Sequence, residues 1–517
     1  MEIRNHKRSM ALLSASVLLA IAGATLAMPQ DSVLQRVIDA LLGRPRPALA
    51  THTTTAAMAS IIQHPRRDAG RLLPAKRNDD PMTTRDDAGW LRTFRREGAI
   101  DRDNAFFQSL GTNGRSCETC HNQATGWSVT PEQIRARFAA SNGTHPIFRI
   151  VDGSNSPIAN VSTVAARRSA YSMLLNRGVI RVGIAIPANA EFTLTDVDDP
   201  YHFASASQLS LFRRPLPSTN LAFLTGVMWD GRENTRAFSA PMHAGEDNAA
   251  LQSALIHQAM DATLGHAQAT SAPTDAQLAE IVAFETSLST AQVRDEIAGF
   301  LNEDDALGGP RALANQRFHV GINDTLGGDP TGALFDDGAI SLFDAWDDRT
   351  WRNDHSRRGN ARAAILRGER LFNAHALTIT GVGGFNDALG QASVAGTCSS
   401  CHNTPNVGNH SVGLPLDIGL TDASRRTPDM PLYTLRNNAT GALRQTTDPG
   451  LALVTGKWKD IARFKGPILR GVVARAPYFH NGFAATLPAV VDFYDTRFAM
   501  HLTRAEKSDL VAFLRSL

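Results

Sequence analysis

Two short motifs constrain this chain more than any other feature of it. The pattern C-x-x-C-H occurs twice, as CETCH at 117–121 and as CSSCH at 398–402, and the two copies hold all 4 cysteines of the 517-residue chain. With this composition, a chance C-x-x-C-H is expected on the order of once per thousand such chains. The fold therefore has to accommodate two sites, each built around one copy.

The spacing of the motif has a chemical reason. Two thiols three residues apart on one turn can both bond the vinyl groups of one porphyrin, and the adjacent histidine then points at the iron. A zinc site would need both pairs together, a redox dithiol does not need the histidine, and a disulfide across three residues would be strained. We therefore predict two covalently bound haem c groups. Their attachment residues are Cys117, Cys120, Cys398 and Cys401, and their proximal ligands are His121 and His402.

The N-terminus has the pattern of an export signal. A basic stretch, MEIRNHKRSM, precedes the apolar stretch ALLSASVLLAIAGATLAM, and TLA at 25–27 is a small-residue cleavage site. We expect a signal peptide at 1–27 and a periplasmic protein, with an uncleaved membrane anchor left open. The net charge of +2 does not favour nucleic acid as a partner.

The rest of the chain divides by its regularity. Helical periodicity surrounds each motif, and long alternating strand patterns are scarce, so we predict a mainly α fold with two cytochrome c-like haem domains in one chain. The predicted segments are an N-terminal extension or linker at 28–85, a first haem domain at 86–295, an inter-domain loop region at 296–357 and a second haem domain at 358–517. Helices are expected at 131–140, 247–264, 275–289, 360–372 and 503–517.

The helix after residue 486 has a clear apolar face. Thr486 fits an N-cap and Pro488 the first turn. Four residues then recur at i, i+3, i+4 and i+7 on one side, which we expect to be buried against a haem. They are Leu487, Val490, Val491 and Tyr494. Further on, Thr503 and Glu506 fit the capping box of a last helix.

Two longer stretches resemble a known family. VMWDGRENT at 227–235 and FKGPILRGVVARAPYFHNGFAATLPAVVDFY at 464–494 are similar to stretches of the bacterial di-haem cytochrome c peroxidases and their methylamine-utilisation (MauG-like) relatives. The order of stretches and haem motifs matches, and the resemblance covers about 90 to 517.

The resemblance implies roles for several residues. It makes the haem on His121 the peroxidatic one and the haem on His402 the electron-collecting one, with Trp229 as a relay between them. Tyr494 stands 14 residues after His480, where the peroxidases place a methionine ligand of the second iron and the MauG-like relatives a tyrosine. The alternative for Trp229 is a tryptophan buried in the core without a relay role, and the alternative for Tyr494 is a core tyrosine that does not bind iron. Met500 follows the helix and is expected to lie too far from this iron.

The sequence also departs from the family pattern near the first haem. Arg137 stands where the peroxidases often carry a removable distal histidine, and His145 follows eight residues later. The first iron is therefore expected to be five-coordinate or to have His145 as a displaceable ligand, the alternative being that His145 is a solvated loop residue. Ser239 falls where the family has a glutamine of the peroxide site. Cleavage of the O–O bond needs a group that moves a proton between the two oxygens. The nearby titratable groups are Glu246, His243, His257 and His266. Glu246 and His266 are the preferred candidates, and the alternative for each is a surface residue.

The family also carries a calcium ion between its haems. The ion is bound by an asparagine side chain and by carbonyl groups near the Ala-Pro-Tyr stretch. Ser169 takes the asparagine position here, whereas the carbonyls of Arg475 and Pro477 remain available. Because losing a side-chain ligand weakens a calcium site, the resemblance leaves calcium open.

Together these features predict a periplasmic peroxidase. It would reduce hydrogen peroxide with electrons from a small donor protein, a cytochrome c or a cupredoxin. The alternatives are a MauG-like enzyme that oxidises a protein or organic substrate, a di-haem electron-transfer cytochrome, and an oxygen-dependent cleavage enzyme. Whether the chain forms a homodimer is left open.

Overall fold

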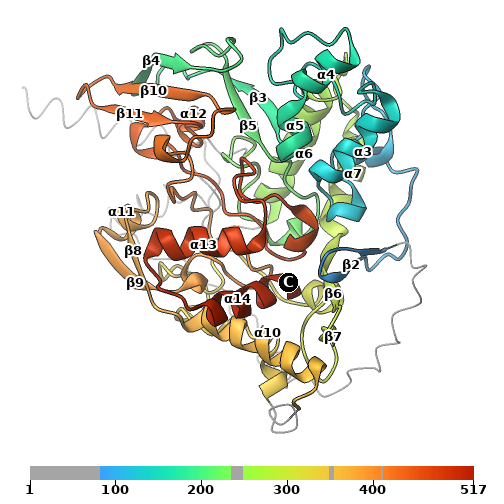
Figure 1. Ribbon diagram of the computed structural model, residues 1–517, viewed down its shortest axis with the longest axis vertical. Coiled ribbons are helices and arrows are strands. Elements are labelled where there is room, and N and C mark those ends of the chain that lie inside the picture. The colour runs from blue at the N-terminus through green and yellow to red at the C-terminus, as the bar shows by residue number, and fades with distance from the viewer. Residues whose placement is uncertain (1–81, 235–247, 348–353, 409–410) are drawn as a thin grey trace, which may run out of the picture. The chain divides into compact units, whose positions relative to one another are not determined.

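The computed structural model describes residues 82–234, 248–347, 354–408 and 411–517 (Figure 1). Lys76–Leu517 clusters as one compact unit. The predicted signal peptide, nearly all of the predicted extension, and the candidates Ser239 and Glu246 lie outside the described residues. Within the described ranges, no helix is both long and apolar enough to cross a membrane.

The predicted helices are confirmed, and their starts follow from their caps. Thr486 and Thr503 each accept a backbone N–H at the starts of α13 and α14 through their hydroxyl groups. The α-helices are α3 (Pro131–Ser141), α4 (Val164–Ala170), α5 (Ser172–Arg177), α6 (Asn248–Gly265), α7 (Asp275–Ser287), α8 (Pro310–Ala314), α10 (Arg357–Ala374), α11 (Asn386–Leu389), α12 (Ala452–Thr455), α13 (Leu487–Phe498) and α14 (Arg504–Ser516). The 3-10 helices are η1 (Ala105–Phe107), η2 (Cys117–Thr119), η3 (Gln123–Thr125), η4 (Leu221–Phe223), η5 (Asp344–Asp347), η6 (Cys398–Ser400), η7 (Ala423–Arg425), η8 (Trp458–Asp460) and η9 (Val472–Arg475).

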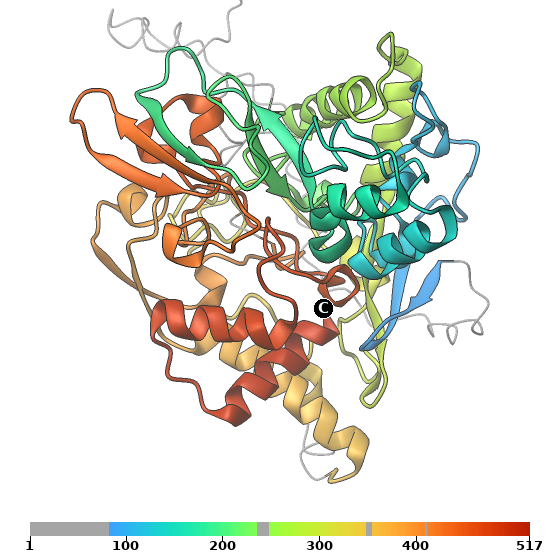
Figure 2. The same ribbon diagram turned by 45° about the horizontal axis from the view of Figure 1, so that its top comes forward.

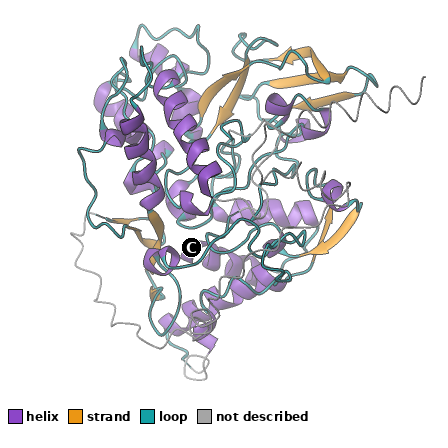
Figure 3. Ribbon diagram, turned by 180° about the vertical axis from the view of Figure 1, so that it is seen from behind, coloured by secondary structure: helices purple, strands orange, loops and turns teal. Residues whose placement is uncertain are grey.

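The prediction of a mainly α fold is wrong. The structure is 34% helical and 16% strand, and its described residues form four antiparallel sheets, which Figure 3 shows in orange. The sheets are β1 (Thr83–Arg85), β2 (Gly89–Phe94), β6 (Ser289–Asp295) and β7 (Gly299–Phe300); β4 (Phe192–Asp198), β10 (Leu432–Asn437) and β11 (Leu443–Thr446); β3 (Ile180–Ile184) and β5 (Leu209–Arg213); and β8 (Leu377–Thr380) and β9 (Ser393–Gly396).

The second motif lies beside a three-helix layer. In Figure 1, α13 and α14 (red) pack together, and α10 (yellow) packs on α14 and contacts η6, which carries Cys398. A Cβ on Gly368 of α10 would lie 2.0 Å from the carbonyl oxygen of Asp509 on α14. A glycine at this position therefore allows the close approach of the two helices.

The first motif is held by a different group of elements. η2 contacts η1, which packs on α7, and α7 packs on α6. Phe106, Trp127 and Phe284 meet here with ring centroids 5.0 to 5.9 Å apart. This cluster of aromatic rings gives the first motif a core of its own.

The two halves of the chain are connected by a sheet. β4, which precedes α6, pairs antiparallel with β10, which follows the second motif, and Tyr433 pairs with Val197 (Figure 1 and Figure 2). Tyr433 is fully buried, and its hydroxyl donates to the carbonyl of Ser210 at 2.8 Å. Two separate haem domains are therefore not shown, because strands from both predicted domains share one sheet and one core cluster.

Candidate functional site

Each C-x-x-C-H motif lines its own cavity. The first-motif cavity has a volume of about 160 Å³, and Cys117, Cys120 and His121 lie in its wall. The second-motif cavity has a volume of about 210 Å³ and is lined by Cys398, Cys401 and His402. All four thiols are free, so no disulfide competes for them.

The two motifs share one local geometry. In each, the first cysteine begins a 3-10 turn, and the histidine N–H donates to the carbonyl of that cysteine at 2.9 Å. The Nδ1 atoms of His121 and His402 lie 3.2 and 3.1 Å from the carbonyl oxygens of Trp127 and Gly408. Because Nδ1 is engaged in this way, Nε2 is the nitrogen that can bind a metal. Burial lowers the pKa of His121 to about 4, which keeps its ring neutral, as a metal ligand requires.

The two cavities share one wall. Trp229, Arg214 and Lys465 line both of them. The Trp229 side chain is 8% exposed, its Nε1–H donates to the carbonyl of Arg214 at 2.7 Å, and its ring lies edge-on to His480 with centroids 6.1 Å apart. The predicted relay residue thus stands where it touches both sites.

Polar atoms without partners test whether haem fits these cavities. Arg475 and His480 are buried in the wall of the second-motif cavity, yet Arg475 Nη1 and both ring nitrogens of His480 find no hydrogen-bond partner among the described residues. Burial lowers the pKa of Lys465 to about 8, and no carboxylate pairs with it within the described ranges. Buried donors beside an apolar cavity favour an anionic ligand, and haem offers two carboxylates and a large apolar ring. The residues therefore fit the group that the motifs predict.

Tyr494 lies in the wall of the second-motif cavity together with the whole predicted face of α13. Its ring centroid is 6.5 Å from that of His402, and its hydroxyl makes no hydrogen bond to any described residue. Burial raises its pKa. Met500 lines the same cavity, although its spacing suggested that it was too far away, whereas His501 is exposed. The sixth ligand of the second iron thus stays a prediction with two candidates.

The first-motif cavity contains two acid–base candidates. His266, a predicted one, has its Nδ1 at 2.6 Å from Asp152, and Asp152 is also paired with Arg115 at 2.7 Å. Glu285 on α7 was not found from the sequence: it is 4% exposed, one of its oxygens has no partner, and burial raises its pKa to about 7. Both side chains line the cavity. The helical pattern of α7 gives no sign that Glu285 faces a cavity.

Other predicted residues lie away from the cavities. His145 does not line either one, and its Nδ1 accepts the N–H of Ile147 at 3.2 Å. Arg137 donates to the carbonyl of Thr119 at 2.6 Å, which braces the first motif from outside. Ser169 is exposed on α4.

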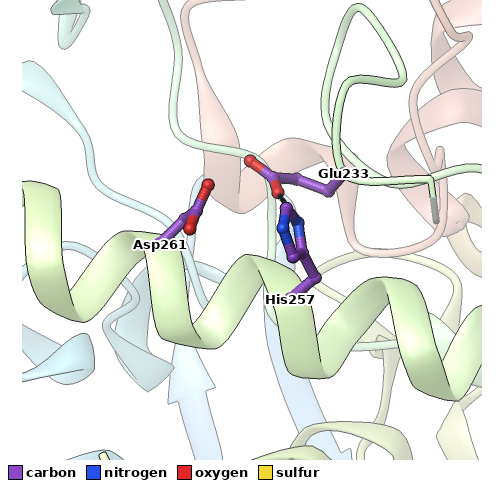
Figure 4. A group of neighbouring side chains, drawn as sticks. All are labelled: Glu233, His257 and Asp261. Atoms are coloured by element: carbon purple, nitrogen blue, oxygen red, sulfur yellow. Dashed lines mark hydrogen bonds and ion pairs between the residues drawn. The ribbon is translucent and has the colours of Figure 1, made fainter. Parts of the chain in front are cut away.

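A further cluster of titratable groups joins α6 to the segment after Trp229 (Figure 4). Glu233, His257 and Asp261 bring one possible metal-ligand atom each to within 4.8 Å of one another. Glu233 already pairs with His257 at 2.7 Å and with Arg232 at 3.4 Å. Its charge is therefore balanced without an ion, and the cluster holds the Trp-Asp-Gly-Arg segment against α6.

Comparisons with known proteins give partial matches. The chain is 32% identical over 140 residues to cytochrome-c peroxidase IdrP1 of Pseudomonas sp. (strain SCT), covering 23% of this chain and 36% of the relative. It is 28% identical over 197 residues to cytochrome-c peroxidase IdrP2 of the same strain, covering 32% and 50%. It is 31% identical over 121 residues to cytochrome c551 peroxidase of Nitrosomonas europaea, covering 23% and 30%. The chain thus spans half or less of the length of these curated relatives. No protein-family model matches.

Among solved structures, a MauG-like protein associated with microbial copper homeostasis aligns over 82% of this chain and 91% of its own, with 15% identity and a TM-score of 0.32. The sequence matches to named cytochrome c peroxidases are the evidence of ancestry. Two C-x-x-C-H motifs, each in its own cavity, agree with them. The chain is therefore similar to cytochrome c peroxidases over about a quarter to a third of its length.

Proposed function

We propose that the chain is a periplasmic peroxidase with two covalently bound haem c groups. It reduces hydrogen peroxide with electrons from a small redox protein, a cytochrome c or a cupredoxin. One observation carries the proposal: two cavities, each lined by a C-x-x-C-H motif, share a wall that contains Trp229. The basic and then apolar N-terminus supports export.

The reaction sets what the protein residues have to do. Reduction of one peroxide consumes two protons and two electrons and releases two waters. When bound, the haem irons supply the redox chemistry, one by activating peroxide and the other by holding an electron. The chain has to orient the two groups, keep water from the apolar cavities, and deliver protons at the peroxide oxygens.

Electrons would pass through the shared wall. The indole of Trp229 is large and oxidisable, and it lies in van der Waals reach of both cavities. Its hydrogen bond to the carbonyl of Arg214 fixes the ring plane. A fixed aromatic ring between two redox groups suits electron transfer in either direction.

Protons would be moved by groups in the first-motif cavity. Asp152 orients His266 through Nδ1, which makes Nε2 the atom that can take a proton from one peroxide oxygen and return it to the other. The Arg115 guanidinium and the His266 ring hold the pKa of Asp152 below its usual value although burial opposes this, so the carboxylate stays charged. Glu285 has a pKa of about 7 and can supply a proton near neutral pH.

Steady-state turnover of hydrogen peroxide with a reduced small cytochrome tests the proposal. We expect saturable peroxide consumption with two equivalents of cytochrome oxidised per peroxide. An EPR spectrum should show one high-spin and one low-spin haem after partial reduction. Two low-spin haems at every redox level would contradict the proposal, because neither iron could then accept peroxide.

Tyr494 supports a second candidate, a MauG-like oxidation of a protein or organic substrate. Its side chain lines the second-motif cavity, and its hydroxyl has no hydrogen-bond partner among the described residues. A phenolate ligand stabilises ferric and higher oxidation states, whereas a thioether favours ferrous iron. A second iron bound by Tyr494 would therefore store oxidising equivalents for another substrate.

Two conservative variants separate the ligands. If Tyr494 binds the second iron, Tyr494→Phe is expected to change the ferric absorption and EPR signals of that haem, whereas the matched variant Met500→Leu leaves them unchanged. The physical reason is that phenylalanine keeps the ring but removes the only donor atom. A spectral change in Met500→Leu alone would identify the thioether as the ligand and favour the ordinary peroxidase.

Glu285 predicts a pH-dependent stability. Its pKa rises from 4.5 to about 7 on folding. The contribution of Glu285 to the free energy of unfolding is therefore full below pH 4.5 and is lost as the pH rises through about 7. The complete loss is on the order of 3 kcal/mol. We expect thermal unfolding of Glu285→Gln to lack this fall, whereas the control Glu118→Gln, at a partly exposed position, keeps it. Parallel pH profiles for wild type and Glu285→Gln would contradict the prediction.

A further inference from the structure

The shared wall contains a buried cation at the place where the family resemblance puts calcium. Arg214 is 4% exposed and follows β5 directly. Its Nη2 donates to the carbonyl of Arg475 at 3.1 Å and lies 3.5 Å from that of Ala476. These oxygens belong to the Arg-Ala-Pro stretch whose carbonyls the resemblance assigned to calcium.

The rest of the guanidinium is also surrounded by carbonyl oxygens. Nη2 donates to Val129 at 2.6 Å, and Nη1 donates to Gly178 at 2.9 Å and to Arg177 at 3.2 Å. Val129 follows the first motif, whereas Arg475 follows the second. The side chain thus joins carbonyls from both halves of the chain, as a bridging metal ion would.

The backbone leaves room for this guanidinium. Gly178, in the left-handed region at φ +60°, caps α5, and a Cβ there would lie 2.0 Å from Arg214 Nη1. Any other residue at this position would displace the side chain. The glycine is therefore an independent sign that the carbonyl cluster is shaped for an arginine.

Calcium does not fit among these groups. A calcium site needs about six to eight oxygen ligands, usually with carboxylates. No carboxylate among the described residues pairs with Arg214, and burial, together with the nearby charge of Arg475, lowers the Arg214 pKa to about 9. A divalent cation would have to displace one guanidinium and lie beside another. The carbonyl of Arg475, one of the two that the resemblance assigned to calcium, is already hydrogen-bonded to Arg214.

We propose that the side chain of Arg214 replaces the inter-haem calcium ion, so that the cation between the two cavities is part of the chain. Five N–H donors in a planar fork suit a cluster of carbonyl oxygens. The charge then belongs to the chain and needs no bound ion, and Arg214 lines both cavities. It stabilises the reduced form of both haems and makes the protein independent of calcium. The inference does not rest on peroxidase activity.

The wild-type holoprotein gives the first test. After dialysis against EGTA, its melting temperature and absorption spectrum are expected to be unchanged, and calorimetry with calcium chloride is expected to show no saturable binding up to millimolar calcium. One bound calcium, or a spectral change that calcium reverses, would overturn the proposal. Neither measurement depends on peroxide turnover. The presence or absence of calcium binding can therefore be determined even if the protein is not a peroxidase.

Variants of Arg214 give the second test. Arg214→Ala is expected to melt at a lower temperature and to shift the reduction potentials of both haems downward, with Arg214→Lys in between. Millimolar guanidinium chloride should restore part of the melting temperature of Arg214→Ala, because the ion refills the carbonyl cluster. The matched control is Arg181→Ala, because Arg181 is a buried arginine that lies outside both cavity walls. This variant should melt at a lower temperature, but guanidinium chloride should not restore its melting temperature and the two reduction potentials should not shift. Unchanged potentials in Arg214→Ala would contradict the inference.

Discussion

A protein in which Cys117 and Cys120 are both alanine is expected to carry half of the covalent haem of the wild type and to lose peroxide turnover. The two thiols lie in the wall of the first-motif cavity, and the other pair lines a different one. If each cavity holds one haem, each pair of cysteines can attach only the haem of its own cavity. Intact mass of the purified protein, and its haem content per chain, measure the loss directly.

The matched variant replaces Cys398 and Cys401 by alanine. It should also lose half of the haem, but the remaining haem sits beside His266 and Glu285 and should still react with peroxide in a single turnover. The pair of variants therefore assigns the peroxide site to one cavity. Full haem content in either variant would contradict covalent attachment at that motif. Peroxide reactivity that survives only without Cys117 and Cys120 would reverse the assigned roles.

Features coded by neighbouring residues were predicted well from the sequence. The cap of α14 needs only Thr503 and Glu506, and the side of α13 that lines the second-motif cavity follows from the helical repeat. The C-x-x-C-H motif is equally local, because one turn contains both cysteines and the histidine. For such elements, the interactions that stabilise the structure lie within a few residues of each other.

Features that depend on distant residues were missed. β4 has the sequence FTLTDVD, with only three apolar residues among threonines and aspartates, and it is stabilised by pairing with β10 some 240 positions later. Its local pattern is therefore typical of a loop, which is why the sequence predicts a mainly α fold. Strand propensity expresses cross-strand packing, which a single segment does not reveal.

The candidate site divides in the same way. Motif and spacing predict Trp229 and Tyr494 as site residues, and both line the second-motif cavity, whereas the partner of His266 lies 114 positions away, at Asp152. The carbonyl of Arg475 that Arg214 contacts is 261 positions from it in the sequence. The resemblance places Ser169 at the asparagine position of the calcium site, whereas Arg214 is the side chain that contacts the carbonyl of Arg475. Glu246, the other acid–base candidate, lies outside the described residues.

The largest loss of stability is expected at Arg213, beside the shared wall. Its side chain is 2% exposed and donates from Nε and Nη2 to both oxygens of Asp448 at 2.7 and 2.9 Å, and from Nη1 to Asp230. Asp230 belongs to the Trp-Asp-Gly-Arg segment, and Asp448 lies in the second half of the chain. Burial would raise the pKa of Asp230, but Arg213 and Arg232 hold it well below its usual range.

Replacing Arg213 by methionine would remove the cation that lies between the buried carboxylates of Asp230 and Asp448. Breaking a buried ion pair in this way destabilises by about 3–5 kcal/mol, because both carboxylates stay buried after the loss of the cation that they share. We expect a loss of this size in the free energy of unfolding, measured in denaturant on the holoprotein. The Trp-Asp-Gly-Arg segment should also be held less firmly against the part of the chain that contains Asp448.

An exposed pair provides the control for this experiment. Arg85 and Glu296 lie 2.8 Å apart with side chains 69% and 42% exposed. Arg85→Gln should therefore change the free energy of unfolding by less than about 1 kcal/mol. Equal effects of Arg213→Met and Arg85→Gln would mean that water reaches the buried network. In that case the Trp-Asp-Gly-Arg segment would not be anchored by charge, and the position of Trp229 between the cavities would depend on its own packing and its hydrogen bond to Arg214.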